Sequence, residues 1–239
     1  MSEWFERWFG EEYLDAYSHR DDDDAERLVR LLGERGIGVA GQRVLDLACG
    51  AGRHAAALRQ RGADVVGMDL SMPLLRRACG RCCCGLVRGD MRRLPFAERS
   101  FDAVLNLFTS FGYFSDDDEH ATVVIEVGRV LRPGGRFVLD FLNAPAVRAG
   151  LVLRDERRRG ERTIVQERRL SPDGRFVVKS IRVGGEERPF VERVRLLERA
   201  EIEGMLAAAG ISAEAALGDY DGAAHDAASP RLILMGRRA

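Results

Sequence analysis

The 239-residue sequence is poor in several features that mark specialised protein classes. Its single lysine is Lys179, and Lys+Arg 37 against Asp+Glu 38 leaves a formal net charge of -1. Such a balance lacks the basic excess that nucleic acid or an anionic membrane surface attracts, so we expect neither as a partner. No apolar run approaches the roughly 20 residues that cross a bilayer. The charged, aromatic N-terminus lacks the apolar centre of a signal peptide, which predicts a cytoplasmic protein.

Cysteine is scarce and unevenly placed. The five cysteines are Cys49, Cys79, Cys82, Cys83 and Cys84. Cys79 and Cys82 have the spacing of a zinc-binding pair, but a tetrahedral site needs four converging ligands and no second pair is present. We therefore expect reduced cysteines and no bound metal.

The length fits one domain, residues 1–239, with some elaboration. Residues 1–40 have helical patterns, with an acidic run at 21–24 that suits a helix N-terminus. From residue 43 onward, apolar runs alternate with helical patterns, which predicts a doubly wound, mostly parallel sheet of the α/β class. The seven expected strands are 43–48, 63–70, 86–89, 101–107, 136–141, 211–220 and 231–236. The expected helices are 11–18, one after the acidic run, 53–61, one starting after Ser71, 116–131 and 200–209, with a turn at 132–135.

Residues 151–196 interrupt this alternation. Three β-rich runs, 163–169, 175–183 and 192–196, are separated by turn sequences, which predicts antiparallel strands. We expect an antiparallel β insert after the fifth strand that contributes to substrate binding or to a dimer contact. A monomer and a homodimer both fit the sequence.

The strongest local pattern is a strand, a glycine loop (residues 48–52) and a helix. Gly50 and Gly52 allow the backbone to pass close beneath a bound molecule, where a Cβ would block it. The following helix offers unpaired N–H groups to a negative ligand. A tight turn that needs glycine for its own geometry is the alternative.

Two acids extend the pattern. Asp69 ends the second expected strand, where a carboxylate can accept hydrogen bonds from both ribose hydroxyls of an adenosine. Asp90 ends the third strand and can accept from an adenine amino group, while Met91 offers its backbone N–H. Either acid alone also suits a helix N-terminus or a turn.

The order of these motifs resembles the class I S-adenosylmethionine (SAM)-dependent methyltransferases, in a subgroup that acts on small molecules. The resemblance is carried by VLDLACGAGRH at 44–54, VGMDLS at 66–71, GDM at 89–91, FDAV at 101–104 and LRPGGRF at 131–137. It implies that SAM is the cofactor and that the acceptor, methylated on oxygen or nitrogen, is a small molecule. One departure is Ala48, where the family has its first loop glycine.

The resemblance also implies individual roles. Asp46, Ala48 and Gly50 would surround the methionine half of the cofactor, with Gly52 completing the loop. Asp69 would hold the ribose and Leu70 would lie against adenine, which Asp90 and Met91 would contact. Asn106 and Leu107 would form the floor below the sulfonium. The helical segment 1–40 resembles the subgroup's lid, in which Tyr17 or Arg20 would cover the cofactor.

An aromatic loop follows the fourth strand, where the methyl group should emerge. Phe108, Phe111 and Tyr113 are expected to contact the substrate or shield the sulfonium, although such rings also cap cores. Methyl transfer needs a general base only when the acceptor starts protonated. His19, Tyr113 and Tyr220 are candidates, and none is singled out.

Two other functions stay open at this point. An NAD(P)-dependent oxidoreductase would have a similar fold, but its loop would carry a third glycine that is missing after Gly52. A non-catalytic SAM-binding protein would share the cofactor site and lack transfer activity.

Overall fold

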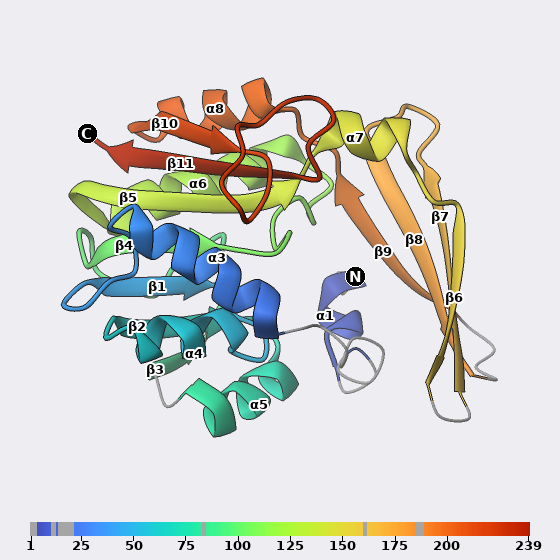
Figure 1. The fold of residues 1–239 in the computed structure, drawn as a ribbon, viewed down its shortest axis with the longest axis horizontal. Coiled ribbons are helices and arrows are strands. Elements are labelled where there is room, and N and C mark those ends of the chain that lie inside the picture. Colours follow the sequence, from blue (N-terminus) through green and yellow to red (C-terminus); the bar gives the residue numbers. More distant parts are fainter. Residues whose placement is uncertain (1–3, 11–12, 14–21, 83–84, 160–161, 185–188) are drawn as a thin grey trace.

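The structure is a computed structural model that describes residues 4–10, 13, 22–82, 85–159, 162–184 and 189–239. Its centre is a seven-stranded sheet in the order β10-β11-β5-β4-β1-β2-β3 (Figure 1). The strands are β1 (Arg43–Leu47), β2 (Asp64–Asp69), β3 (Gly85–Arg88), β4 (Phe101–Asn106), β5 (Leu131–Leu142), β10 (Ile211–Leu217) and β11 (Arg231–Arg238).

The sheet is parallel except at one strand. β1 pairs in parallel with β2 and β4, and β4 pairs in parallel with β5, whereas β11 runs antiparallel to both β5 and β10. Each of the seven expected strands is present. The α/β prediction of a mostly parallel seven-stranded sheet with an antiparallel insert is therefore confirmed.

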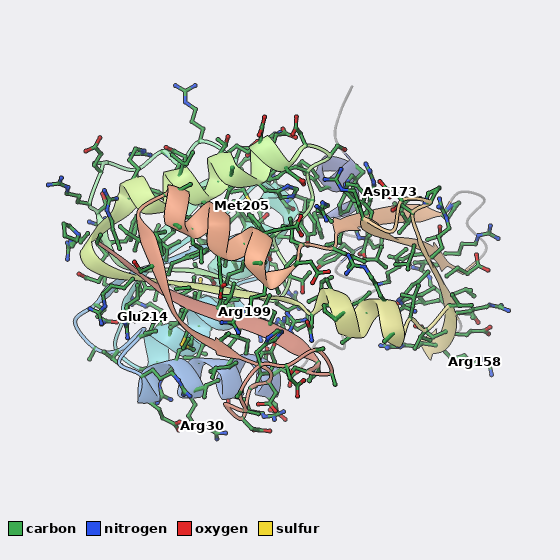
Figure 2. All side chains as sticks on the ribbon, turned by 90° about the horizontal axis from the view of Figure 1, so that it is seen from above. Arg30, Arg158, Asp173, Arg199, Met205 and Glu214 are labelled. Carbon is green, nitrogen blue, oxygen red and sulfur yellow. The ribbon has the colours of Figure 1, made fainter. Side chains whose placement is uncertain are left out.

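Helices cover both faces of this sheet. On one face α6 (Asp117–Val130) and α8 (Arg199–Ala208) pack on inward side chains such as Leu45 and Leu139. On the other face α3 (Asp22–Glu34), α4 (Arg53–Gln60) and α5 (Met72–Cys82) pack on the alternate side chains, among them Val44 and Val138. Seen from above, α6 and α8 lie on one side and α3 on the other (Figure 2). This alternation along each strand is why both faces are buried.

The insert is a second sheet with the order β6-β7-β8-β9, antiparallel throughout. Its strands are β6 (Arg154–Arg159), β7 (Arg162–Leu170), β8 (Phe176–Val183) and β9 (Phe190–Arg195). It lies beside the carboxyl edge of the main sheet, with the short helix α1 (Trp4–Trp8) between the two (Figure 1). Trp8 packs with Ile164, Ile181 and Val183 in a small core of their own.

The expected helix start after Ser71 is confirmed, and the helix expected from residue 116 begins at Asp117 with Asp116 as its cap. Ser71 caps α5, because its Oγ accepts a hydrogen bond from the Leu74 N–H at 3.2 Å. Asp116 caps α6, where its carboxylate accepts from the Asp118 N–H at 3.0 Å. Both satisfy N–H groups that a helix start leaves without a partner.

Three details differ from the sequence prediction. The turn at 132–135 lies inside β5, because the pairing with β4 shifts from Phe101↔Leu131 to Ala103↔Arg136 and the intervening residues leave the ladder. β6 was not expected, since its RDERRR sequence shows no apolar alternation. The short helix α7 (Ala144–Ala149) was also missed, because six residues are too few for a helical period to be recognised.

No helix in the described part of the chain is long and apolar enough to cross a membrane. Of the cysteines, Cys49 and Cys82 are buried and Cys79 is exposed, all as free thiols. Cys82 donates to the Ala78 carbonyl at 3.3 Å within α5. Cys83 and Cys84 lie outside the described residues.

Candidate active site

A cavity of about 1010 Å³ opens at the carboxyl ends of β1 to β4. This volume is at the upper end for small-molecule sites and leaves room for two ligands. α1, the glycine loop, the start of α5, the loop after β4 and strand β9 form its walls. The predicted site residues that line it are Ala48, Gly50, Asp69, Leu70, Asp90, Met91, Leu107, Phe108 and Tyr113.

The glycine loop forms one wall of the cavity. Ala48, Gly50 and Gly52 all adopt left-handed conformations, with φ of 60°, 55° and 79°. A Cβ added at Gly50 would meet no protein atom within 4 Å, whereas one at Gly52 would come within 3.0 Å of the Ala78 Cβ. Gly50 therefore leaves space for a ligand, and Gly52, which does not line the cavity, permits close packing on α5. Ala48 has the left-handed backbone conformation that glycine adopts most easily, which gives a physical reason for a glycine at this position in the family it resembles.

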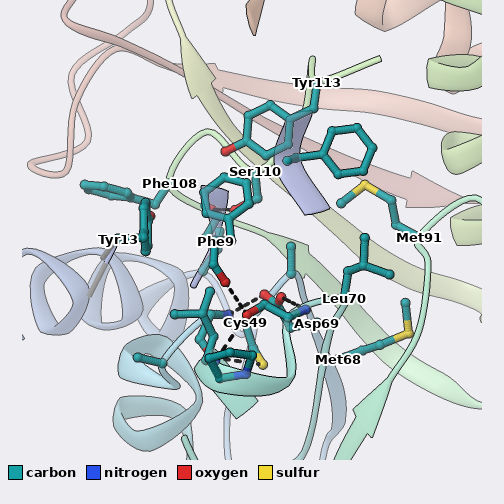
Figure 3. A pocket seen from close by; sticks show the side chains of 18 of the residues that line it. Phe9, Tyr13, Cys49, Met68, Asp69, Leu70, Met91, Phe108, Ser110 and Tyr113 are labelled. Carbon is teal, nitrogen blue, oxygen red and sulfur yellow. Dashed lines mark hydrogen bonds between the residues drawn. The ribbon is translucent and has the colours of Figure 1, made fainter. Parts of the chain in front are cut away.

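Asp69 lies at the end of β2 beneath the glycine loop (Figure 3). Its two carboxylate oxygens accept hydrogen bonds from the N–H groups of Gly50 and Ser71, each at 2.8 Å. Burial raises the pKa of Asp69 despite these bonds. A carboxylate has about four acceptor sites, so one that holds the loop can also accept from a ligand hydroxyl.

Asp46 lies behind the loop and does not line the cavity. It is 1% exposed, and its Oδ2 is buried without a hydrogen-bond partner. Burial, with the nearby charge of Asp69, raises the pKa of Asp46 to about 7, and the backbone N–H of Ala55 opposes this shift. The site thus contains a carboxyl group that is half protonated near neutral pH.

The raised pKa of Asp46 predicts a specific pH dependence of stability. The folded protein holds a proton on Asp46 that the unfolded chain releases near pH 4, so the favourable contribution is complete below pH 4 and is lost as the pH rises to 7. Across that window the free energy of unfolding should fall by roughly 1 kcal/mol per pH unit. Chemical denaturation at several pH values measures it. Asp46→Asn should flatten the slope, and an unchanged slope would contradict the assignment.

Asp90 and Met91 line the cavity beyond β3. Burial alone would raise the pKa of Asp90, but hydrogen bonds from the Arg92 side chain and backbone outweigh it and lower the pKa. Arg92 Nη2 lies 2.6 Å from Asp90 Oδ2 and its Nη1 lies 2.5 Å from Glu119 Oε1. Asp90 is therefore ionised and fixed in orientation.

The loop after β4 (residues 107–116, the aromatic loop) starts with two unusual residues. Phe108 and Thr109 have φ of 58° and 60°, left-handed values that non-glycine residues rarely adopt. Asp140, at the end of β5 and fully buried, accepts from the Phe108 N–H at 2.9 Å, and its own carbonyl accepts from the Thr109 N–H at 2.9 Å. These bonds offset the strain and hold both residues in the cavity wall.

Asp140 is in turn held by two residues from the far end of the chain. Arg231 Nε donates to Asp140 Oδ1 at 2.8 Å and Arg231 Nη2 donates to Thr109 Oγ1 at 3.0 Å. The Tyr220 hydroxyl donates to Asp140 Oδ2 at 2.9 Å, and Tyr220 does not line the cavity. The structure thus places Tyr220, a candidate base, behind the wall as a supporting donor. We call this group the Asp140 network: Phe108, Thr109, Asp140, Tyr220 and Arg231.

Several predicted residues lie away from the cavity. Phe111 is 2% exposed and packs against Phe141 and His120, so its placement at the substrate is corrected to the core. Tyr113, two residues further along the same loop, lines the cavity. Asn106 is buried below the floor, where its Nδ2 donates to the Leu47 carbonyl at 3.1 Å. Tyr17, His19 and Arg20 lie outside the described residues.

Aromatic rings from the N-terminal segment also line the cavity, together with Tyr113. Phe9 lies 5.6 Å from Tyr113 and 4.8 Å from Tyr13, measured between ring centroids (Figure 3). Trp4 lies 5.1 Å from Tyr113. Its Nε1 donates to the Tyr113 carbonyl at 3.3 Å, and Ser71 Oγ donates to the Phe9 carbonyl, so this segment joins the aromatic loop to α5.

Three parts of the site are not predictable from the sequence pattern. Trp4 and Phe9 gave no periodic signal, since α1 has only five residues. Asp140 was visible as a single acid in the apolar run FVLDFL of β5, but nothing nearby in sequence indicated its partner Arg231. Glu192 and Val194 line the cavity from β9 and had been assigned only to the insert.

The sequence and the fold are both similar to those of known methyltransferases. Residues 44–135 match the family model of a methyltransferase domain. A dTDP-3-amino-3,4,6-trideoxy-alpha-D-glucopyranose N,N-dimethyltransferase from Streptomyces venezuelae is 31% identical over 180 residues, which cover 72% of this chain and 76% of the relative. SAM-bound CalS10, an amino pentose methyltransferase from Micromonospora echinaspora, is 27% identical with a TM-score of 0.71, over 95% of this chain and 96% of that one.

A demethylmenaquinone methyltransferase from Clavibacter sepedonicus is 42% identical over 113 residues, which cover 46% of this chain and 44% of that protein. The chain therefore spans less than half the length of this relative. The longer match to the Streptomyces enzyme shows the family. The chain belongs to the class I SAM-dependent methyltransferases, a family of enzymes, and SAM is its cofactor.

The site's own geometry fits this cofactor. Gly50 opens onto space that a Cβ would fill, and Asp69 presents a fixed carboxylate at the end of β2 in the same cavity. Family membership removes the nicotinamide-dependent alternative, in agreement with the missing third glycine.

Proposed function

We propose that the protein transfers a methyl group from SAM to an amino nitrogen of a small molecule, with an amino sugar as the favoured acceptor. The observation that carries the proposal is the cavity, in which the glycine loop faces a wall of aromatic rings across a volume that fits a cofactor and an acceptor together. The Streptomyces relative and CalS10, by their names, both act on amino sugars. Nitrogen is therefore preferred to oxygen, which the sequence left equally open.

When bound, SAM supplies an electrophilic methyl group on a positively charged sulfur. In our proposal Asp69 accepts from the ribose hydroxyls, Leu70 and Met91 lie against adenine, and Gly50 admits the methionine half. The chain's main contribution is to align the acceptor and exclude water, because methyl transfer has a good leaving group.

A general base is needed only for a protonated acceptor. Of the three candidates, Tyr113 is the one described residue that lines the cavity, and its hydroxyl donates to the Thr109 carbonyl at 2.7 Å. That bond directs the hydroxyl's own proton at Thr109 and leaves its lone pairs free to accept a hydrogen bond from an amine N–H. Of the expected lid at 1–40, the part that would cover the cavity is the one around Trp4, Phe9 and Tyr13, which line it, whereas α3 packs on the main sheet.

We further propose that the protein works in the cytoplasm, without nucleic acid or membrane as a partner, as a monomer or homodimer. The near-neutral charge supports the absence of nucleic acid. Sedimentation of the purified protein distinguishes a monomer from a homodimer.

The function is tested with SAM carrying a labelled methyl group. The acceptors are free and dTDP-linked amino sugars, each paired with the sugar that has a hydroxyl in place of the amine. Transfer to amino sugars alone supports the proposal. Transfer only to the hydroxyl partners would overturn the choice of nitrogen, and S-adenosylhomocysteine binding with no transfer to any acceptor would indicate a non-catalytic SAM-binding protein.

Asp69 provides a direct test of the cofactor site. Asp69→Ala should weaken S-adenosylhomocysteine binding by roughly 1–3 kcal/mol, or about 5- to 150-fold, because charge-assisted bonds to the ribose are lost. Calorimetry measures the affinity. Asp69 also accepts hydrogen bonds from the Gly50 and Ser71 N–H groups, so its loss could act through the loop as well as through the ribose. Asp69→Asn keeps one acceptor oxygen and should retain the fold, which separates the structural role from the ribose contact. Unchanged affinity in both variants would rule out the ribose contact.

A further inference from the structure

Charge is divided between the two sides of the cavity. The side formed by α4, α5 and the ends of β2 and β3 carries six charged lining residues: Arg53, Arg77, Arg81, Arg88, Asp69 and Asp90. The side formed by the N-terminal segment and β9 carries one among the described residues, Glu192. The other described lining residues there are Trp4, Phe5, Phe9, Gly10, Tyr13 and Val194. Among the described residues of this side, one carboxylate therefore stands in a largely aromatic wall.

Glu192 is held rigidly in that wall. Trp8 Nε1 donates to its Oε1 at 2.6 Å, and Lys179 Nζ lies 3.3 Å from its Oε2. Lys179 is its direct neighbour across strands β8 and β9. The side chains of Glu192 and Lys179 are 15% and 17% exposed. The Glu192 carboxylate is therefore fixed by its partners and still lines the cavity.

The position is unusual for a charged residue. Side chains alternate along a strand, so Phe190, Glu192 and Val194 point to the same face of β9. Phe190 packs on Trp8 with ring centroids 4.3 Å apart, and Val194 lines the cavity. A buried charge on such a face is unfavourable unless partners satisfy it. An apolar residue would pack there more simply, which points to a role for the charge itself.

The surrounding rings favour the same kind of ligand. Tyr13, Phe9, Tyr113 and Trp4 form a continuous series of ring contacts beside the carboxylate's wall. Aromatic faces attract ammonium groups, and cages of such rings recognise alkylammonium ligands. A carboxylate adds a charge-assisted hydrogen bond to an N–H donor.

We propose that Glu192 and this aromatic wall form a subsite that binds an amine of the acceptor in its protonated, ammonium form. The inference rests on the proposed function and adds that the acceptor amine is bound in its ammonium form, with Glu192 as the residue that recognises the charge. Glu192 acts on acceptor binding, because an ammonium nitrogen has no lone pair and must lose a proton before it can accept a methyl group. Its removal should therefore raise KM more than it lowers kcat.

Binding can be tested without knowing the natural acceptor. The chain has two tryptophans: Trp4 lines the cavity, and the buried Trp8 donates to Glu192 from behind, so intrinsic fluorescence reports on the subsite. With S-adenosylhomocysteine present, choline and its uncharged isostere 3,3-dimethylbutan-1-ol are titrated into the protein. Choline should change the fluorescence with saturation and bind at least about tenfold more tightly than the alcohol, a difference of 1.4 kcal/mol or more. Equal binding of the two probes would overturn the proposal.

Two variants separate recognition from structure. Glu192→Gln keeps an acceptor for Trp8 but loses the charge, so choline should bind about tenfold more weakly while S-adenosylhomocysteine affinity stays within twofold. Lys179→Met removes the ion pair and leaves the carboxylate, so choline binding should be retained or increase. If both variants lower thermal stability alike and leave choline binding unchanged, the pair is only structural.

The two proposals fail in distinguishable ways. Absence of transfer to every amine in the acceptor panel would overturn the proposed function, whatever choline does. Transfer to amino sugars by Glu192→Gln with unchanged KM would overturn the subsite and leave the function standing.

Discussion

Replacing Arg231 with methionine is expected to lower the free energy of unfolding by about 3–5 kcal/mol, as when one partner of a buried ion pair is removed. The loss is large because Asp140, the charge left behind, is fully buried. The same change releases Thr109 and weakens the hold on Phe108, so the cavity floor should loosen as well. Denaturant unfolding measures the stability.

Two further variants check the cause of that loss. Tyr220→Phe removes one hydrogen bond to Asp140 and should cost only about 1 kcal/mol. The double variant Asp140→Leu with Arg231→Met removes both charges and should recover part of the stability lost in the single variant. If the double variant loses as much free energy of unfolding as Asp140→Leu and Arg231→Met lose when their separate losses are added, the broken ion pair is not the origin of the instability.

The second large effect is expected at Gly50. Gly50→Leu should abolish S-adenosylhomocysteine binding, with at least a hundredfold loss or about 2.7 kcal/mol, because the new side chain fills space where no protein atom lies within 4 Å. Calorimetry on the folded variant measures the affinity.

Gly36 offers a matched control for backbone strain. It has φ of 70° against 55° at Gly50, and a Cβ there would also meet nothing within 4 Å, but it does not line the cavity. Gly36→Leu should therefore destabilise the fold by a similar amount and leave binding intact. Equal loss of binding in both variants would show that strain, not occupied volume, is responsible.

The central fold was predictable because its signals are local. β1, β2 and β4 are short apolar runs bounded by turn residues, and Ser71 and Asp116 mark helix starts by their capping chemistry. Asp69 was found for the same reason, since a strand end is visible in the sequence.

The remaining parts of the site depend on contacts between distant segments. Arg231 meets Asp140 across 91 positions, and Trp8 meets Glu192 across 184. No period or motif connects such residues. For this reason the sequence suggests Tyr220 as a candidate base, whereas in the structure its hydroxyl donates a hydrogen bond to Asp140. Phe111 was misplaced because the left-handed turn at Phe108 and Thr109 has no glycine to announce it.

The core of the insert has a consequence for where the protein can be altered. Trp8, Ile164, Ile181 and Val183 form a cluster of their own, and Trp4 and Phe9 pack against both this cluster and the one beneath α6 and α8. Changes in contacts that do not share partners combine almost independently. Changes at Ile164, Ile181 or Val183 should therefore disturb the main sheet less than changes at Trp4 or Phe9, which makes the inside of the insert the part of this fold that can be altered at least cost to the glycine loop.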